Sequence, residues 1–468
     1  MTWKELDFTS YQVLAILGVY TYSYIYTTPM YVFPVLGFSQ PQWKCNEVDI
    51  LRFRPPEPPG QNCSLLKSCP NVSYVYNFRS AAVDFQLQCD RKMYIAYIIT
   101  AQTCGLLLGF ALLGYISDTY GRKPAALTSI LGSLISCSVA TFALTWYHLA
   151  AAIFCFAVFN GGTLVVTRIM VLEEVEVEQR LFVRAIAHFF GGARMLFALL
   201  AYLTHDWRIT LSILIIISLP AVFIMTCCIQ ETRRFKTLQK LRRLEKEEQL
   251  MAEETAIKSP GGAVRTPHCE NSYCVLFQKD LRKTTLICSF NYFTMSCMRY
   301  GIDLRTNYIF DNVYLNIAVI GACFTVGKII LFFVDKFWPN FNRRSLHNAA
   351  FGGMTLAALS LAILSNFHGV WINSVITGVA ILGTMATEWA RDSAVLQMNE
   401  IFPTRVRSQG TALGTFLGTT GIPLAPYILY GAGEPIAMLA FGLLGLANLI
   451  ITNIFVVTEM KGKELEDK

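Results

Sequence analysis

Long apolar segments recur along the whole chain and determine the secondary structure that we expect. Crossing a bilayer as a helix takes about 20 apolar residues, and runs of this kind occur twelve times. Each run is predicted to be a helix, because lipid offers backbone groups no water to bond. The runs cover residues 11–36, 93–116, 125–145, 148–172, 184–203, 209–229, 284–302, 313–334, 346–366, 370–399, 408–430 and 436–457.

Two polar segments interrupt this pattern. One of them, 39–91, follows the first run, and the other, 230–282, separates the sixth run from the seventh. The prediction is an all-α polytopic membrane protein with twelve transmembrane helices in two six-helix halves. The N-terminal half is residues 1–229, the linker is 230–282, and the C-terminal half is 283–468.

Composition favours the same class of protein. Of the 468 residues, 54% are hydrophobic and 15% are charged, whereas a soluble chain carries roughly 25% charged residues. A soluble two-domain protein fits the length, but it would lack charge for its surface. The first run is too long for a signal peptide, and it lacks a basic flank and a cleavage site of small residues.

The basic residues of the short loops predict the orientation of the helices. If the helices alternate in direction, these loops lie on one side of the membrane, which the positive-inside rule assigns to the cytosol. Both termini then lie in the cytosol, and we expect a plasma-membrane protein. The loops concerned contain Arg122 and Lys123, the stretch from Arg233 to Arg243, Arg343 and Arg344, and Arg405 and Arg407.

The segment 39–91 is then predicted to be exported and glycosylated. It contains both N-x-S/T sequons of the chain, at Asn62 and Asn71, and four of the fourteen cysteines. An even number of cysteines in an exported loop predicts two disulfides, and four cysteines leave three pairings open. The candidates are Cys45, Cys63, Cys69 and Cys89.

No catalytic pattern is found, so we do not expect an enzyme. There is no P-loop, and no hydrolase, zinc-protease or dinucleotide-binding fingerprint lies in a suitable context. His268, Cys269 and Cys274 match no common zinc spacing. We expect no cofactor, no metal and no nucleic-acid partner.

The loop between the second and third runs contains a recognisable pattern, formed by Gly114, Asp118, Gly121, Arg122 and Lys123. It resembles the G-x-x-x-D-x-x-G-R-K/R loop of the major facilitator superfamily of membrane transporters. Gly114 allows close helix approach and Gly121 allows a tight turn. Asp118 can pair with a basic residue across the interface of the two halves, which would latch one conformation.

Other segments resemble further signatures of that superfamily. Asp335 with Arg343 and Arg344 forms a weaker second copy of the loop, where a second six-helix repeat would place it. The other matches are Glu173 with Arg180, Trp207 with Arg208, the segment from Glu400 to Arg407, and the segment from Glu459 to Gly462. Sugar porters share several of these.

The end of the exported loop, from Ser73 to Asp90, resembles that of the organic cation, anion and zwitterion transporters (solute carrier 22-like). This resemblance implies a carrier of small organic ions that works by alternating access. Two departures are present: the segment from Glu231 to Phe235 lacks the proline of the family, and Ile153 replaces an arginine. A non-transporting membrane scaffold or sensor with the same fold is therefore an alternative.

Charged residues inside the apolar runs predict where the substrate binds, because charge is costly in lipid and usually functional. At 1.5 Å per residue, Arg391 lies about 14 Å from the inner end of its run, and Arg194 and Lys328 lie about 15 and 10 Å from the inner ends of theirs. Glu388 is placed to pair with Arg391 at three residues' separation. Asp392, His188 and Arg168 complete the set.

The resemblance adds three positions. It places Lys328 at the lysine that is typical of anion carriers, Tyr300 at an aromatic that packs against substrate rings, and Thr419 where cation carriers have Asp and anion carriers have Arg. Aromatics of the first and seventh runs are further candidates for the cavity wall. They are Tyr20, Tyr22, Tyr24, Tyr26, Phe290, Tyr292 and Phe293.

We predict a transporter of small organic ions and favour an organic anion, because Arg194 and Lys328 have no carboxylate nearby in sequence. An organic cation, a zwitterion (carnitine-like) and a sugar-porter-like substrate are alternatives. The expected partners are the substrate and the lipid bilayer. The sequence leaves the oligomeric state, the coupling ion and the direction of transport open.

Overall fold

The computed structural model describes most of the chain. Eight helices of this part are long and apolar enough to cross a membrane, by length and composition, and Gly191–Thr204 is a shorter apolar helix. The described residues are 11–39, 42–45, 72–174, 190–232, 235–237, 239–240, 244, 277, 279–306, 312–338, 342–367, 369–402 and 407–455.

Each of the six apolar runs of the first half forms a helix in its described part, although residues 142–145 and 228–229, at the ends of two runs, are not helical. Helix α6 packs against α1, α4 and α5, while α9 packs against α1, α5 and α8. The closest approach of α4 to α6 is at Gly109, where an added Cβ would overlap the Val158 carbonyl oxygen. These helices are α1 (Tyr11–Leu36), α4 (Met93–Tyr120), α5 (Arg122–Thr141), α6 (Trp146–Glu174), α8 (Phe190–Thr204) and α9 (Trp207–Cys227).

The second half contains the other six runs, and α11 packs against α14, α15, α16 and α17. The run predicted at 408–430 differs, because it is broken at Thr420. Pro423 explains the break: a proline has no N–H to donate and its ring clashes with the carbonyl four residues earlier, here that of Thr419. The helices are α11 (Lys279–Thr306), α12 (Val313–Phe337), α13 (Arg343–Leu364), α14 (Val370–Ile401), α15 (Arg407–Thr419), α16 (Gly421–Ala432) and α17 (Glu434–Phe455).

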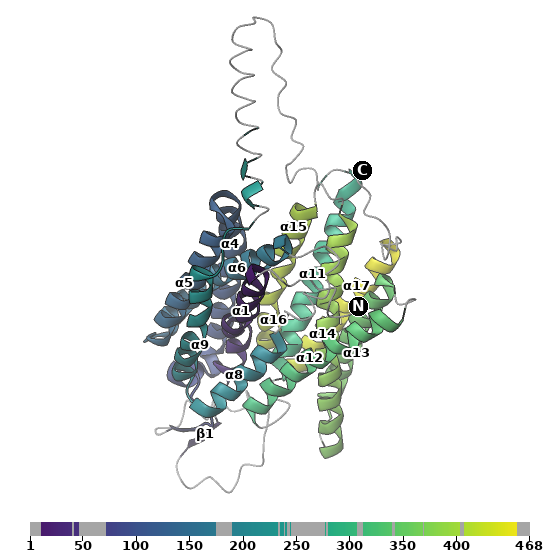
Figure 1. The fold of residues 1–468 in the computed structure, drawn as a ribbon. Coiled ribbons are helices and arrows are strands. Elements are labelled where there is room, and N and C mark those ends of the chain that lie inside the picture. Colours follow the sequence, from purple (N-terminus) through teal and green to yellow (C-terminus); the bar gives the residue numbers. More distant parts are fainter. Residues whose placement is uncertain are drawn as a thin grey trace, which may run out of the picture.

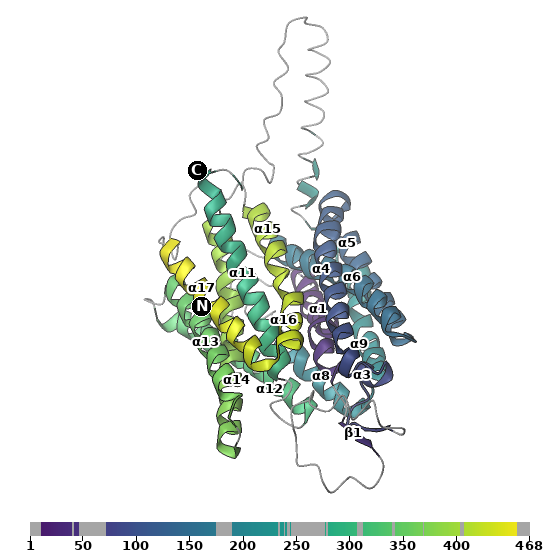
Figure 2. The same ribbon diagram turned by 180° about the vertical axis from the view of Figure 1, so that it is seen from behind.

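The helices form two groups that lie side by side (Figures 1 and 2). The first group is α1 to α9 and the second is α11 to α17. They meet where α8 packs against α12 and where α4 packs against α16. Gly191 and Gly321 allow the α8–α12 contact, since a Cβ on Gly191 would lie 2.5 Å from the Gly321 carbonyl oxygen.

One end of the bundle carries a small β-hairpin, and we call it the hairpin end (Figure 1). Strands β1 (Gln42–Cys45) and β2 (Val72–Val75) pair antiparallel, with Gln42 opposite Val75. The short helices α3 (Ala81–Asp84) and η3 (Cys89–Lys92) follow. The all-α prediction holds for the membrane spans, and this sheet lies outside them. We call the opposite end, where α4 joins α5, the Gly121 end.

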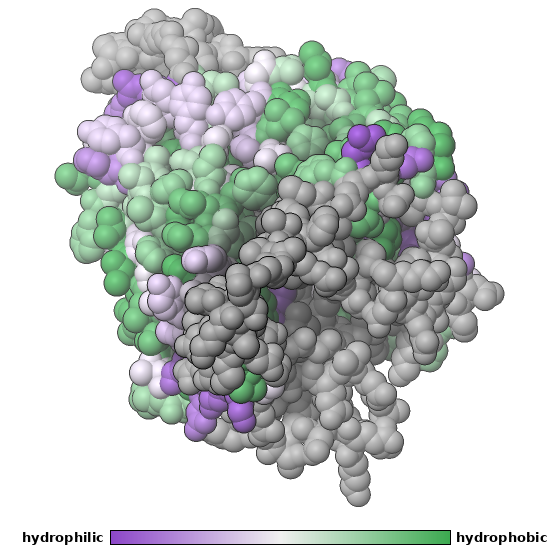
Figure 3. Space-filling model, turned by 90° about the horizontal axis from the view of Figure 1, so that it is seen from above, coloured by the Kyte–Doolittle hydropathy of each residue, from purple (hydrophilic) through white to green (hydrophobic). Residues whose placement is uncertain are grey.

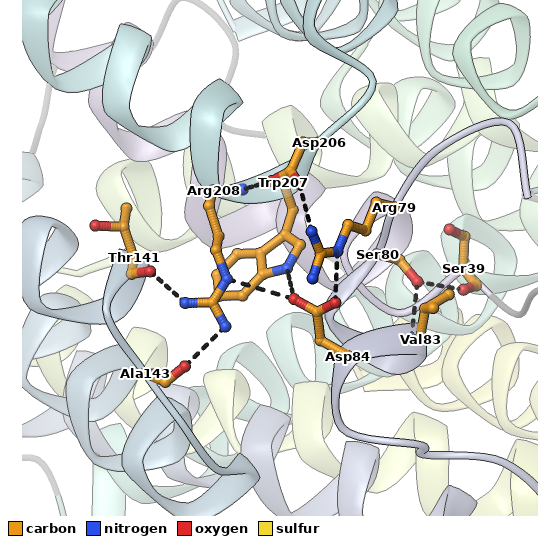
Figure 4. Close-up of polar contacts among 10 residues, drawn as sticks. All are labelled: Ser39, Arg79, Ser80, Val83, Asp84, Thr141, Ala143, Asp206, Trp207 and Arg208. Carbon is orange, nitrogen blue, oxygen red and sulfur yellow. Dashed lines mark hydrogen bonds and ion pairs between the residues drawn. The ribbon is translucent and has the colours of Figure 1, made fainter.

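Asp84 fixes the hairpin end to the first group of helices (Figure 4). Its carboxylate accepts hydrogen bonds from Trp207 Nε1 at 3.0 Å, from Arg79 Nε at 2.8 Å and from Arg208 Nε at 3.3 Å. Arg208 also donates to the carbonyls of Thr141 and Ala143 at the end of α5. The segment 39–91 is therefore tied to α9 and to the α5–α6 loop at once.

These contacts change the acidity of Asp84. Burial, the largest single influence, raises the pKa of its carboxyl group, but the hydrogen bonds from Trp207, Arg79 and Arg208 outweigh burial. The pKa of Asp84 is consequently lower than its ordinary value of 3.8. Asp84 is a carboxylate at neutral pH, and its charge stabilises the folded hairpin end.

The hairpin end also contacts the second group of helices, through Tyr314 at the start of α12. The Tyr314 hydroxyl donates to the Asn77 carbonyl at 2.9 Å and lies 2.9 Å from His205 Nδ1. The rings of Phe78 and Tyr202 pack edge-on against Tyr314. We call these five residues the Tyr314 seam.

Two predictions for the segment 39–91 concern residues that are only partly described. Cys89 is disulfide-bonded, and its partner is not among the described side chains. The side chain of Cys45, and Cys63 and Cys69 as a whole, lie outside the described residues, as do the sequons at Asn62 and Asn71. Glycosylation and the pairing therefore stay predictions.

The flanks of the bundle are apolar. Figure 3 looks onto the Gly121 end and shows hydrophobic residues over the sides of the molecule. On α9, for example, Ile216, Leu219 and Phe223 point outward and are exposed. Large apolar side chains on an outer face suit a lipid environment, so the chain is a multi-pass membrane protein.

Candidate functional site

Charged side chains from four helices gather between the two groups. A single charge inside an apolar helix is costly in lipid, and here the charges are placed against one another. The residues are Arg194 on α8, Arg299 and Asp303 on α11, Lys328 on α12, and Glu388, Arg391 and Asp392 on α14. We call this set the charge cluster.

Glu388 is at the centre of the cluster, with a side chain only 1% exposed. Arg299 Nη2 lies 2.7 Å from one of its oxygens, and Arg391 and Lys328 approach the other. Lys328 also forms an ion pair with Asp392. Three helices of the second group are thereby linked through one buried carboxylate.

Arg194 forms a second part of the cluster and contacts the other group of helices. Its Nη1 lies 3.2 Å from the Asp303 carboxylate, and its side chain is 0% exposed. The ring of Phe324 lies 5.3 Å from the Arg194 guanidinium and 5.0 Å from that of Arg299. Two guanidinium groups thus share one aromatic ring, which is a favourable cation–π arrangement.

This geometry corrects one expectation. Arg194 and Lys328 were expected to lack a carboxylate, yet each has one from another helix, Asp303 and Asp392 respectively. Sequence distance does not reveal contacts between helices, which explains the error. Arg299 and Asp303 were missed altogether, although two charges in one apolar run were a signal that could have found them.

Side chains of α1 and α6 lie on the other side of the space between the groups. The hydroxyls of Tyr20 and Tyr24 are 2.9 Å apart. Tyr20 is hydrogen-bonded to Arg168, and Tyr24 lies close to both Arg168 and Arg391. The side chain of Arg168 is nevertheless exposed, so it does not lie in a packed core.

The other predicted substrate residues that the structure describes, Tyr300 and Thr419, are both buried. Tyr300 is buried on α11, beside Tyr430, Asp303 and Arg194. Thr419 is buried at the end of α15, and its hydroxyl donates to the Thr415 carbonyl at 2.6 Å. His188 and the side chain of Tyr26 lie outside the described residues.

The predicted gating motif lies at the Gly121 end. Gly121 has φ +123°, as a tight turn before α5 requires. Arg122 forms an ion pair with Asp118 of the same loop, so this described contact of Asp118 lies within the first group. The latch between the two groups stays a prediction.

Glu231 contributes to this motif in a way that sequence reasoning missed. Its carboxylate accepts the backbone N–H of Arg122 at 2.9 Å and that of Lys123 at 3.1 Å. A carboxylate is favourable at the N-terminus of a helix, here α5, because unpaired N–H groups and the helix dipole point at it. The missing proline after Glu231 therefore leaves this contact intact.

Gly114 does not make the close helix approach that the motif predicted. A Cβ added to it would meet no described atom within 4 Å, so no close helix approach occurs there. The close approaches of α4 lie earlier in the helix, at Gly105 and Gly109. The other gating candidates, Arg180 and the side chains of Glu173, Glu400 and Arg407, lie outside the described residues.

A cluster of charged side chains where two groups of membrane helices meet is typical of one class of protein, the membrane carriers. The chain belongs to the Major Facilitator Superfamily, whose sequence profile matches residues 86–426. The predicted superfamily is thus confirmed, and it is a family of membrane transporters rather than of enzymes.

Curated relatives extend over most of the chain. An uncharacterized protein of Caenorhabditis elegans is 27% identical over 92% of this chain and 86% of its own length. The organic cation transporter protein of Drosophila melanogaster is 28% identical over 81% of this chain and 72% of its own length. Solute carrier family 22 member 7 of Bos taurus is 26% identical over 82% of this chain and 72% of its own length. The predicted resemblance to solute carrier 22-like proteins is confirmed.

A solved structure shares the fold. The inward-open xylose transporter XylE from Escherichia coli superimposes with a TM-score of 0.63, covering 97% of this chain and 98% of that one. The sequence identity is 14%, so this likeness concerns the fold alone.

Proposed function

We propose that the protein carries small organic ions across the plasma membrane by alternating access, and that organic anions are its main substrates. The observation behind the anion is the charge balance of the site. In the described residues, the charge cluster together with Arg168 contains five cations and three carboxylates. An excess of two positive charges in a bundle interior attracts an anion.

The position of Arg168 and Arg391 supports the same substrate. Both approach Tyr24, so an anion between them would touch one guanidinium from each group of helices. The Tyr20 and Tyr24 rings, packed edge-on at 5.4 Å, supply an aromatic wall for the organic body. A site of this kind binds a charged end group specifically and an apolar body loosely.

A zwitterion is the second candidate, and the Lys328–Asp392 pair favours it. The two side chains form an ion pair and both are partly exposed. A zwitterion could replace this pair, with its acid on Lys328 and its amine on Asp392 or Glu388. A cationic substrate is also tested, because the chain is similar to the organic cation transporter protein of Drosophila melanogaster.

The orientation and the moving parts belong to the same proposal. The hairpin end would be extracellular, with both termini in the cytosol. The halves 1–229 and 283–468 would rock about the charge cluster, with 230–282 as the linker. The described cross-group contacts at Tyr314, Thr100 and Lys92 lie at the hairpin end, which is the arrangement of a carrier closed to the outside.

Uptake into vesicles tests the proposal. Matched anionic, cationic and zwitterionic aromatic probes would be offered to wild-type protein, to Lys328→Ala and to Lys328→Arg. We expect anion uptake by the wild type and a decrease of at least about tenfold in Lys328→Ala, since a charge-assisted contact contributes about 1.5–3 kcal/mol. Lys328→Arg keeps the charge and should retain part of the activity.

Lys283→Ala is the matched control, because Lys283 lies over the Phe455 ring at the far end of α11 and should not affect selectivity. Cation uptake that survives Lys328→Ala, without anion uptake by the wild type, would refute the anion. Competition by a hexose would favour a sugar carrier. Uptake of no probe by folded protein would favour the non-transporting scaffold or sensor.

A further inference from the structure

We propose that Asp303 is the proton-binding site of the transport cycle. In this proposal, which rests on the protein being a carrier, the Arg194–Asp303 ion pair holds the hairpin end closed. A proton that binds Asp303 releases Arg194 and lets that end open. The proton then crosses the membrane together with the substrate anion.

The pair joins the two halves of the molecule. Arg194 belongs to α8 of the first group, and Asp303 belongs to α11 of the second, with 3.2 Å between Nη1 and Oδ2. The ion pairs around Glu388 lie within the second group, so they can move as a unit. A rocking motion of the groups leaves those pairs intact and separates Arg194 from Asp303.

Asp303 lies near the surface from which a proton would arrive. It is three residues before the end of α11, which is about 5 Å along the helix axis. Its side chain is 10% exposed, whereas that of Arg194 is 0% exposed. The carboxylate is therefore the more exposed member of the pair.

Electrostatics explains why a proton on Asp303 would release Arg194 from the ion pair. Separating two ionised groups inside a protein leaves each charge without its counter-ion, which is strongly unfavourable. The Nε and Nη2 atoms of Arg194 find no hydrogen-bond partner among the described residues, so Asp303 is the described counter-ion of this guanidinium. A protonated Asp303 is neutral and no longer attracts Arg194.

The charged and titratable groups around Asp303 are consistent with its role as the proton-binding site. Arg194 faces it from α8, and Arg299 and Tyr300 lie one turn or less away on α11. Tyr430 of α16 lies beside Tyr300. Arg299 is itself 2.7 Å from Glu388, so the nearby positive charge that changes partner on opening is Arg194.

Release of Arg194 creates the need for an anion. Once Asp303 is neutral, the buried Arg194 guanidinium no longer has its described counter-ion. A substrate carboxylate or sulfate would then replace Asp303 on Arg194. One proton and one negative charge enter together, and the proton leaves on the other side when the ion pair forms again.

Vesicles with a pH-sensitive dye inside test this coupling. For the wild type we expect anion uptake to rise as the outside is acidified, by no more than about tenfold per pH unit for a single titrating group. We also expect anion uptake to acidify the vesicle interior. Asp303→Asn imitates the protonated carboxyl group, so it should take up the anion independently of pH and without proton movement.

Glu434→Gln is the matched control. It removes another carboxylate at the same end, which is paired with Arg305 within the second group, and it should leave both pH dependence and proton movement unchanged. Wild-type uptake that neither responds to pH nor moves protons would overturn the proposal. Proton movement that persists in Asp303→Asn would overturn it as well.

A measurement without substrate separates this proposal from the proposed function. Phe78 is buried in the Tyr314 seam, so alkylation of Phe78→Cys reports opening of the hairpin end. Its rate at pH 5.5 relative to pH 7.5 should be several-fold higher in the wild-type background than with Asp303→Asn. That result without uptake of any probe would refute the proposed function and leave the proton site standing. Equal pH responses in both backgrounds would refute the proton site.

Discussion

At the scale of single residues, the buried charges described above lie next to hydrogen-bond donors or opposite charges. Asp84 accepts three hydrogen bonds from Trp207, Arg79 and Arg208. Glu388 is surrounded by two guanidinium groups and an ammonium group. A carboxylate held in this way stabilises the fold only while it is ionised, which makes its contribution measurable by pH.

Asp84→Asn should destabilise the hairpin end by about 1–3 kcal/mol at neutral pH, because Trp207 and Arg208 lose a charged acceptor. The folded-state pKa of Asp84 is lower than its ordinary 3.8, so its stabilisation is fully present above about pH 4. It is lost as the pH falls through the folded-state pKa. The Tm of wild type should exceed that of Asp84→Asn by a constant amount from pH 7 to 5, and the two should converge below pH 4.

Arg79→Gln provides the control for this experiment. Arg79 is 52% exposed, and exposed ion pairs contribute little, so its removal should lower Tm much less than Asp84→Asn. A difference between wild type and Asp84→Asn that persists unchanged below pH 3 would show that the carboxylate charge is not what stabilises this end.

The sequence predicts buried charges better than their partners. Lys328, Arg391 and Glu388 were found because each interrupts an apolar run. The pairing of Lys328 with Asp392 and of Arg194 with Asp303 depends on which helices touch, and no spacing rule reaches across helices. Only the contact at three residues' separation, Glu388 with Arg391, is local enough to be read from the chain.

At the scale of helices, glycines decide which pairs approach closely. Gly109 of α4 faces the α6 backbone at Val158, whereas Gly114, about one turn further along α4, faces open space. Periodicity alone cannot separate the two positions, and the motif led us to choose Gly114. The structure assigns the helix contact to Gly109.

Gly109→Ala and Gly114→Ala form a matched pair for testing this assignment. An added Cβ at Gly109 overlaps a carbonyl oxygen, so α4 and α6 must move apart, at a cost of about 1–3 kcal/mol. At Gly114 the same change should be neutral or stabilising by up to about 1 kcal/mol, because alanine is the better helix former. Thermal unfolding in detergent should give a lower Tm for Gly109→Ala only.

Equal Tm values for the two variants would show that α4 and α6 can relax around the added methyl group. A further result would be informative: stable Gly114→Ala protein with impaired transport would place a close contact at Gly114 in another conformation of the cycle. That outcome would rescue the expectation drawn from the motif.

The broken helix α15–α16 shows a second limit of apolar patterns. The run 408–430 is continuous in hydropathy, so it was predicted as one helix. Pro423 carried the signal for a break, and it was overlooked because prolines are tolerated in membrane helices. Gly421, next to the break, packs against the α11 backbone at Phe293, where a Cβ would lie 2.6 Å from the carbonyl oxygen.

At the scale of the whole molecule, each of the twelve apolar runs contains helix in its described part, and eight of the described spans are long and apolar enough to cross a membrane, because the bilayer imposes a length on apolar helices. The arrangement of the spans could not be derived in this way. The α8–α12 and α4–α16 contacts between the groups join segments more than a hundred residues apart in the chain.

The orientation can be tested with the two sequons. Protein made in a eukaryotic host should shift in gel mobility after glycosidase treatment, because Asn62 and Asn71 are predicted to be exported with the hairpin. Asn62→Gln combined with Asn71→Gln should abolish this shift. A glycosidase-sensitive shift that remains in the double variant would show that another part of the chain is exported, and the assignment of the hairpin end to the outside would fail.

The Tyr314 seam has a consequence for reagents that act from outside the cell. In this conformation the rings of Phe78 and Tyr314 are buried against each other, so the two halves share the outer surface around them, and in the proposed cycle these halves would separate when the carrier opens outward. An antibody fragment raised against that composite epitope would recognise a single conformation. It would inhibit by immobilising the protein, without entering the cavity, and its potency would be independent of which substrate is carried.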